Sequence, residues 1–295
     1  MPQIVDLLRD MIAIAWRVWS SPVNAARFVA FGGALVAWVV YKRYEERKWP
    51  NFLTRDAATD AIYTAIYLGG FYSVCIAAPI FAVSERLVVR FAPFLQLHLL
   101  QNANPLVQIA VVSITMDFAC YWVHRFFHTS TILWSFHRIH HSQTELSPLT
   151  GYRFHIAEAI VRGLAPMIPG IMLGPTTATF TIAIWLDTTL NALAHSGGSW
   201  TFGILGQALV SPHFHRLHHA VDPRLHQGNY GLTYSLWDRL FRTAVVASEA
   251  PAAYGVPEEV PRSFLKQLVD PVFVISRRSF RQSSATNVTA QSAST

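Results

Sequence analysis

Charged side chains are scarce in this chain of 295 residues, where Asp, Glu, Lys and Arg together make up 14%. A soluble domain carries about a quarter. Hydrophobic residues make up 52% of the sequence, and the mean hydropathy is +0.29. These proportions exclude an ordinary soluble domain and predict an integral membrane protein. We assign the net charge of +6 to membrane topology and anionic lipid headgroups, and we expect no nucleic-acid partner.

Cysteine is scarce as well, because Cys75 and Cys120 are the only two. Both lie in apolar stretches, without the spacing of a disulfide framework or a zinc ribbon. The sequence also lacks a Gly-rich dinucleotide fingerprint and a CxxCH haem-attachment motif. Any redox chemistry of this chain must therefore draw its electrons from a partner.

Long apolar stretches predict an all-α fold with about five transmembrane or hairpin helices under a cytoplasmic, histidine-rich helical cap. Gly174-Pro175 should turn the last two stretches into a hairpin. Interfacial helices are expected at residues 1–20 and 84–101, and a disordered tail at 282–295. The expected spans are residues 25–40, 57–83, 105–122, 156–173 and 176–194.

The basic and aromatic border that follows the first span, from Tyr41 to Trp49, should face the cytoplasm. Counting crossings from there places most Lys and Arg residues on the cytoplasmic side, together with all the histidine groups described below. We expect a multi-pass protein of a bacterial inner membrane, or of the endoplasmic reticulum in a eukaryote. The chain divides into an N-terminal region (1–104), a histidine-box domain (105–243) and a cytoplasmic C-terminal segment (244–295) with a partly disordered tail.

Eight of the 13 histidines form three groups, spaced HxxxH, HxxHH and HxxHH. Four residues advance about 400° along a helix, so each group presents its rings on one face. Asn191 and His195 form a further i, i+4 pair. A lone histidine at a membrane interface is usually an amphipathic side chain, as we expect for His98, and His213 and His226 lie off the pattern. The predicted metal ligands are His124, His128, His137, His140, His141, His195, His215, His218 and His219.

So many imidazoles exceed what one zinc ion accepts, which implies two ions. Imidazole suits zinc, copper, iron and nickel alike. A site within a membrane has lipid chains as its natural substrates, and attack on an unactivated C–H bond needs redox chemistry that zinc cannot supply. We therefore expect two iron ions with dioxygen, and zinc as a substitute in purified protein.

The histidine boxes and their flanks resemble the fatty acid hydroxylase and sterol desaturase superfamily of membrane di-iron enzymes. The similarity runs from about Asp117 to Thr243, and the first hundred residues carry no diagnostic motif. The matching segments are DFACYWVHRFFH (117–128), LWSFHRIHHS (133–142), YRFH (152–155), NALAH (191–195), HRLHH (215–219), NYG (229–231) and SLWDRLFRT (235–243).

This resemblance implies a cytoplasmic cap in which eight box histidines, with His195 as a ninth, bind two irons that activate dioxygen. The substrate would be a lipid or sterol, and the reaction a hydroxylation, a desaturation or an oxidative demethylation. The electron donor would be a carrier such as a ferredoxin or a cytochrome b5-type protein.

Three further residues have possible supporting roles. Asp117 lies two helical turns before His124 on the same face, so its carboxylate should either hydrogen-bond an imidazole or pair with an arginine at the helix border. Asn191 is either a weak or water-mediated ligand or a polar residue facing another helix. His155 precedes Ile156 where relatives often have proline, so we assign it support of the cap.

Two other classes of protein stay open. A zinc-dependent membrane hydrolase would need a general-base carboxylate, as in HExxH, and none of the three boxes contains one. A metal transport or storage protein would place its ligands along a path within the spans.

Overall fold

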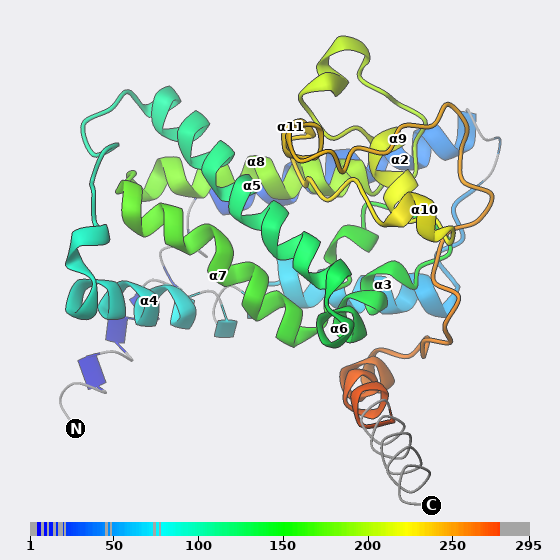
Figure 1. Cartoon of the computed structure of the whole chain (residues 1–295), viewed down its shortest axis with the longest axis horizontal. Helices are drawn as coiled ribbons and strands as arrows, with labels where there is room; N and C mark the ends of the chain where they lie inside the picture. The colour runs from blue at the N-terminus through cyan, green and yellow to red at the C-terminus, as the bar shows by residue number, and fades with distance from the viewer. Residues whose placement is uncertain are drawn as a thin grey trace, which may run out of the picture.

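A computed structural model describes residues 22–44, 49–72 and 78–277, with a few isolated residues outside these ranges (Figure 1). Within them the chain is helical, and its only β-type pairings are the isolated bridges Leu209–Tyr234 and Ala220–Tyr254. The prediction of a helical fold is confirmed for this part of the chain. Most of the predicted interfacial helix at 1–20 and all of the tail at 282–295 lie outside the described residues.

Six helices form the body of the molecule, and four short ones form the cap. The body consists of α2 (Pro22–Tyr44), α3 (Arg55–Leu68), α4 (Ala78–Phe91), α5 (Pro105–Thr129), α7 (Ile156–Leu173) and α8 (Thr177–Ala194). The cap consists of α6 (Thr131–His141), α9 (Pro212–His218), α10 (Pro223–His226) and α11 (Leu236–Leu240). In the body, α5 packs against α7 and α8, α2 packs against α8, and α4 packs against α7.

The long helices run along the molecule, so their ends gather at two poles (Figure 1). The last turns of α2, α5 and α8 and the first turns of α3 and α7 lie at the pole that also carries α6, α9 and α10. The three histidine groups and His195 therefore meet at one pole, as crossing parity predicted. Which side of a membrane this pole faces stays a prediction.

Gly174 turns α7 into α8 at the opposite pole, as the sequence predicted. It adopts the left-handed conformation, with φ 64° and ψ 47°, that a side chain rarely tolerates. His98 packs beside it, because a Cβ on Gly174 would lie 2.8 Å from the His98 ring. His98 thus lies at the pole opposite the three histidine groups.

The predicted single span at 57–83 is wrong. The first helix ends at Leu68, Gly69 caps it, and Gly70 takes a φ of 91° that turns the chain before α4 begins. Two consecutive glycines break the helix although the surrounding residues are apolar. The interfacial helix predicted at 84–101 is also wrong, since residues 84–91 complete α4 and only the short 3-10 turn Pro93–Leu95 follows.

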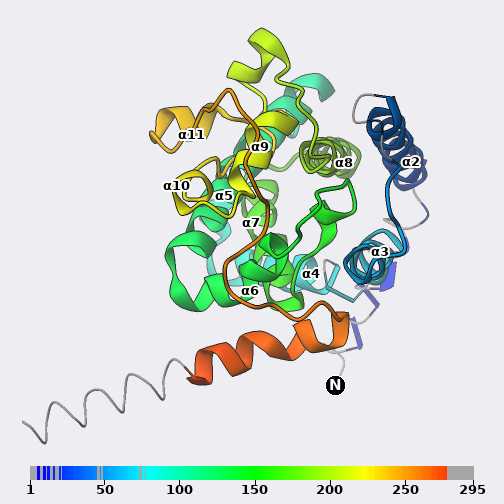
Figure 2. The same ribbon diagram turned by 90° about the vertical axis from the view of Figure 1, so that its right-hand side faces the viewer.

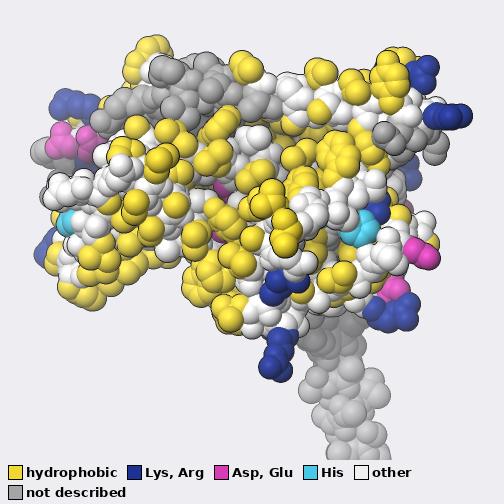
Figure 3. Space-filling model, turned by 90° about the horizontal axis from the view of Figure 1, so that it is seen from above, with side chains coloured by type: hydrophobic (Ala, Val, Ile, Leu, Met, Phe, Trp, Pro, Cys, Tyr) yellow, Lys and Arg dark blue, Asp and Glu magenta, His cyan; other side chains and the backbone are white. Residues whose placement is uncertain are grey.

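Two of the described helices, α5 and α7, are long and apolar enough to cross a membrane. Large hydrophobic side chains project outward from the body, among them Val29 on α2, Leu106 on α5 and Ile168 on α7. Figure 3 shows a largely apolar face whose Lys and Arg side chains lie toward its edges. An exposed apolar surface of this extent indicates membrane association. The expected number of about five spans stays a prediction.

The C-terminal segment packs against the body near the histidine pole. A helix over residues 264–277 lies below α3 and α6 in Figure 2. Arg138 of α6 forms an ion pair with Asp270 and donates to the Glu259 carbonyl at 3.1 Å. Phe264 contacts Tyr63 of α3, with ring centroids 4.9 Å apart. The part of this segment up to residue 277 is therefore built into the fold.

Candidate metal centre

The nine histidines predicted as ligands lie together in two buried groups. Within each group, one ring nitrogen of every member lies within 4.8 Å of the others. None of the nine side chains is more than 6% exposed. The first group is His124, His128, His137, His141 and His218. The second is His140, His195, His215 and His219.

Local helix geometry places the rings. Ser130 both ends α5 and caps α6, accepting a hydrogen bond from the Leu133 N–H, so the chain turns sharply between the first two boxes. In α6, His137 and His141 are one turn apart and face the first group. Their neighbour His140, about 100° round the helix from His141, faces the second group.

The third box divides its rings in the same way. His215 and His219, four residues apart in and just after α9, belong to the second group, and His218 belongs to the first. The HxxHH spacing therefore serves two sites at once. Helix α8 contributes His195, which caps its C-terminal end and completes the second group.

Three rings have a backbone hydrogen-bond partner that fixes their tautomer. His124, His218 and His195 donate from Nδ1 to the carbonyl oxygens of Tyr230, Gly228 and Asn191, each at 2.7 Å. A carbonyl oxygen only accepts, so the proton of each neutral ring is on Nδ1. Each Nε2 atom is then left with a bare lone pair.

These bare nitrogens face one another. His124 Nε2 lies 3.0 Å from His218 Nε2, and His195 Nε2 lies 3.0 Å from His215 Nε2. Between His124 and His218 neither nitrogen has a proton to donate, so the contact is repulsive unless a cation lies between the lone pairs. Two imidazoles bound to one ion at about 2.1 Å have a nitrogen separation of this size. His128 and His141 of the same group have no hydrogen-bond partner on either ring nitrogen. The donor set therefore fits a bound metal ion.

Burial keeps the rings of the cap neutral. It lowers the pKa of His140, His141, His215, His218 and His219 well below the usual value, and that of His195 to about 3. Neighbouring imidazoles lower the pKa further in the first five of these rings. Neutral imidazole is the form that binds metals. The site is thus prepared for metal at physiological pH without losing protons first.

Glu158, which the sequence interpretation missed, is the carboxylate that contacts an imidazole. Its Oε1 accepts a hydrogen bond of 2.7 Å from His137 Nδ1, and both side chains are fully buried. Arg162 lies one turn along α7, with its Nη1 3.7 Å from the same oxygen. A carboxylate in this position orients a metal-binding imidazole and raises its basicity. An acidic residue in the first turn of an apolar helix, four residues before an arginine, was the signal available in the sequence.

Asp117 does not have the partner that the sequence suggested. Its carboxylate accepts hydrogen bonds from the backbone N–H groups of Thr233 and Tyr234, at 2.9 and 3.1 Å, and from Trp237 Nε1 at 2.9 Å. Both predicted alternatives, an imidazole and an arginine, are therefore replaced by a segment that follows the third box. Helical periodicity gave the face of Asp117 correctly, but it carries no information about which distant segment covers that face.

Asn191 and His155 support the site indirectly. Asn191 holds His195 through its backbone carbonyl, and its side-chain amide donates to the Gly151 carbonyl at 3.4 Å. His155 caps α7 by accepting from the Ala157 N–H at 3.0 Å, and its Nε2 donates to the Leu268 carbonyl at 3.1 Å. His155 thus ties the C-terminal helix to the body.

The two histidines off the pattern lie in different places. His226 stacks on Trp134, with centroids 5.7 Å apart, and its ring is 6.3 Å from that of His128. It therefore borders the first group. His213 donates to the Ala247 carbonyl and accepts from Arg216, so it belongs to the packing of the cap.

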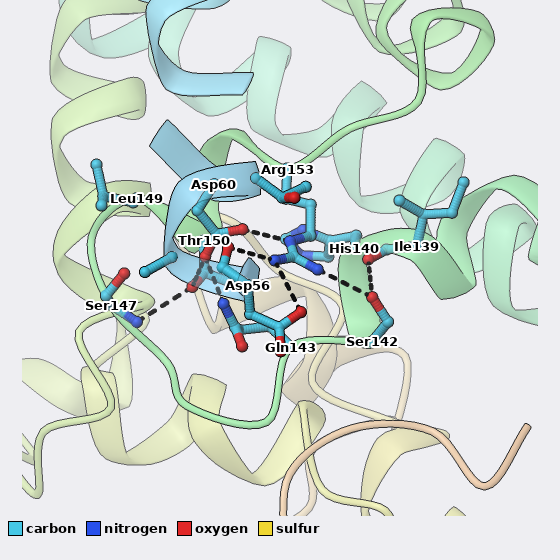
Figure 4. A network of polar contacts seen from close by, with 12 residues as sticks. Asp56, Asp60, Ile139, His140, Ser142, Gln143, Ser147, Leu149, Thr150 and Arg153 are labelled. Carbon is cyan, nitrogen blue, oxygen red and sulfur yellow. Dashed lines mark hydrogen bonds and ion pairs between the residues drawn. The ribbon is translucent and has the colours of Figure 1, made fainter. Parts of the chain in front are cut away.

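A buried polar network holds the segment between the second box and α7 (Figure 4). Arg153 forms an ion pair with Asp60 of α3, and it donates to the Asp56 carbonyl and to Ser142 Oγ. Gln143 donates to the other oxygen of Asp60 at 2.6 Å. The network lies beside His140 in Figure 4, so it fixes the end of α6 that carries the second box.

A cavity of about 220 Å³ lies beside the second group, between α5, α7 and α8. Its wall is mainly apolar and includes Met116, Phe180 and Ile184. Gly151, Phe154 and Asn191 form the end near the imidazoles. Phe154 stacks on His140 with centroids 5.1 Å apart, and a Cβ on Gly151 would lie 3.2 Å from His195 Nδ1. A hydrocarbon chain fits such a wall.

The structure thus combines an apolar helical body with two buried imidazole groups that could hold metal ions, the second of them beside an apolar cavity. The sequence profile of the fatty acid hydroxylase family matches residues 109–243, which include all nine histidines. The resemblance that the histidine boxes indicated is therefore confirmed for this segment.

Several curated proteins are similar to the chain. Ornithine lipid hydroxylase OlsE of Rhizobium tropici is 26% identical over 233 residues, covering 77% of this chain and 69% of the relative. Alkylglycerol monooxygenase of Xenopus tropicalis is 28% identical over 145 residues, covering 49% of this chain and 32% of the relative. Very-long-chain aldehyde decarbonylase GL1-11 of Oryza sativa subsp. japonica is 29% identical over 185 residues, covering 58% of this chain and 65% of the relative. Beyond the first relative, the chain spans less than two thirds of these proteins. No solved structure matches the chain.

Proposed function

We propose that the chain is a membrane di-iron oxygenase that hydroxylates a C–H bond of a lipid or sterol with dioxygen and external electrons. The observation that carries this proposal is the pair of bare Nε2 lone pairs 3.0 Å apart, in a buried group of five imidazoles with a second group of four beside it. The apolar cavity next to the second group supplies room for a lipid chain. Two relatives are named as a lipid hydroxylase and a monooxygenase, which favours hydroxylation over desaturation.

Iron bound by the two groups would supply the activation of dioxygen. The nine imidazoles would hold the ions, and the carbonyls of Tyr230, Gly228 and Asn191 would fix ring orientation. Glu158 would make His137 a stronger donor. In the overall reaction one oxygen atom enters the C–H bond and the other leaves as water, and the two electrons and two protons come from outside.

The chain's own contribution to the reaction is placement and exclusion of water. The cavity would hold the substrate chain along α8, and Phe154 would close the space beside His140. An apolar wall keeps water out of the cavity, which protects a reactive oxidant from unproductive side reactions. We assign electron delivery to a ferredoxin or a cytochrome b5-type carrier at the cytoplasmic face, and we place the chain in its membrane as a multi-pass protein.

The alternative functions have less support. A zinc hydrolase needs a carboxylate beside its water, and among the described residues both imidazole groups contain histidine alone. A metal transporter would spread its ligands along the spans, whereas here they gather at one pole.

The test is oxygen transfer by iron-loaded protein made in iron-replete cells. With reductant and a lipid extract, isotopically labelled dioxygen should place label in a lipid product. His218→Ala should abolish this labelling. His98→Ala, which changes an exposed histidine at the other pole, should retain it. The proposal would be overturned if protein from iron-replete cells held zinc at full occupancy and took up no oxygen under reducing conditions.

A further inference from the structure

The cavity contains charged groups that a purely hydrocarbon ligand would not require. Asp117 and Asp187 lie on its wall, and Arg162 lies there on a different helix. Burying a charge in an apolar wall is costly unless a partner compensates for it. The partners of these three residues therefore indicate which chemical groups of a ligand the cavity can bind.

Two of the three charges are compensated within the protein. Asp117 accepts three N–H hydrogen bonds from the segment 233–237. Arg162 is 3.7 Å from Glu158, and its guanidinium lies 4.2 Å above the ring of Phe154. Neither group needs a ligand.

Asp187 is compensated far less. One oxygen accepts the Thr233 hydroxyl at 2.5 Å, and among the described residues no Lys, Arg or His forms an ion pair with it. Thr233 also donates its backbone N–H to Asp117, so the two carboxylates flank one threonine.

Asn191 provides an independent sign of a missing donor. It is 7% exposed, it lies on the cavity wall, and its Oδ1 has no hydrogen-bond partner. A buried amide oxygen without a donor costs free energy unless a ligand supplies one. Asp187, Asn191 and His195 are spaced by four residues, so one face of α8 carries two acceptors in line with the second imidazole group.

We propose that the cavity binds a lipid whose polar part carries a protonated amine, with Asp187 as its counter-ion and Asn191 Oδ1 as a second acceptor. An ammonium group has three donors and no acceptor, which matches two acceptors on one wall. If this lipid is the substrate, a point that rests on the proposed function, the oxidised carbon lies near the headgroup. Asp187 is two helical turns, about 12 Å along the axis, from His195.

The experiment compares octadecylamine with octadecanol, two ligands with the same chain. Full-length protein is placed in phosphatidylcholine nanodiscs, and the bound ligand is quantified by native mass spectrometry. Wild type should prefer the amine about 10- to 100-fold, the range that a hydrogen-bonded charge supplies. Asp187→Asn keeps the contact with Thr233 and removes the charge, and it should abolish the preference. Bilayer partitioning is the same for both proteins and cancels.

Matched variants make the result specific. Thr181→Val changes another cavity residue, whose hydroxyl donates within its own helix, and should leave the preference unchanged. Asp187→Glu retains the charge and should keep part of the preference for the amine. If Asp187→Asn fails to fold, wild type alone decides, with the binding of each ligand divided by its concentration in protein-free nanodiscs. Acetylation of the amine removes the charge and should then remove the preference. Equal binding of amine and alcohol by wild type would overturn the proposal, as would an undiminished preference in Asp187→Asn.

The source of the amine is resolved by two further ligands, an ethanolamine phospholipid and an aminoacyl lipid, each offered alone. The one that binds in an Asp187-dependent manner identifies the headgroup. An amine preference without oxidation of any lipid would defeat the proposed function and leave the amine site standing. Oxidation of neutral and amine lipids alike, without a preference in binding, would support the proposed function and overturn the amine site.

Discussion

The two imidazole groups differ in how firmly the protein orients their rings. In the first group three rings are held at Nδ1, by two backbone carbonyls and by Glu158. In the second group only His195 is held in this way, and the Nδ1 atoms of His140, His215 and His219 have no partner. Because the outer nitrogen sets the orientation of a metal-binding ring, the first group is more rigidly organised.

The less constrained group is the one beside the cavity. Gly151 and Phe154 bring the cavity wall into contact with His195 and His140. The first group therefore has the more rigidly oriented rings, and the second group has the access to the cavity. We expect the first group to retain metal tightly, and the second to tolerate changes in ligand geometry where the substrate lies.

The largest effect should come from removing one ring of each group in turn. His218→Ala should empty the first group and His195→Ala the second, so each variant loses about half of the bound metal and oxygen transfer falls at least about 100-fold. Metal content by mass spectrometry and labelled-oxygen incorporation provide the measurements. Loss of all metal in both variants would show that the groups do not bind independently.

The next effect concerns the support beneath the second box. Asp60→Asn removes the charge that pairs with Arg153 in a site 1% exposed, and breaking a buried pair costs about 3–5 kcal/mol. Thermal unfolding in detergent should show a clear loss of stability. Asp222→Asn is the control, because its pair with Arg224 is exposed and the change should leave the unfolding temperature almost unchanged. Equal stability of the two variants would remove the network from the account.

A smaller effect should come from the carboxylate that distinguishes the first group. Glu158→Gln retains an acceptor for His137 and removes the charge, so metal affinity of the first group should fall about 10- to 100-fold. Competition with a chelator measures this affinity, and the second group should be unaffected. Glu145→Gln, on the exposed surface, serves as the control. If the metal affinity of both groups fell equally, Glu158 would have a general structural role instead.

The smallest effect is the contribution of a single imidazole ring to the pH dependence of the metal-free protein. The cap histidines are neutral when folded, with the pKa of His195 at about 3, whereas an unfolded histidine has its ordinary pKa near 6.5. The unfolded chain therefore binds more protons between these values, and folding stability falls as pH decreases below about 6.5. Each ring contributes up to about 1.4 kcal/mol per pH unit. Thermal unfolding between about pH 7.5 and 5.5 measures the slope, and His195→Ala should reduce it.

The sequence predicted those parts of the site that depend on local spacing. The three boxes and the Asn191–His195 pair place their rings through helix periodicity, so all nine histidines and the hairpin at Gly174 could be located in advance. Glu158 and the pair of Asp60 with Arg153 could not, because each contact joins residues 21 or 93 positions apart. The break after Leu68 was missed because composition outweighed two adjacent glycines.

The most direct test of the central claim is the metal content of purified, iron-loaded protein, read together with its X-ray absorption spectrum. Two ions per chain in a nitrogen-rich shell, falling to about one in both His218→Ala and His195→Ala, is the predicted result. A wild-type content of one ion or none, or a content that neither variant changes, would contradict the account.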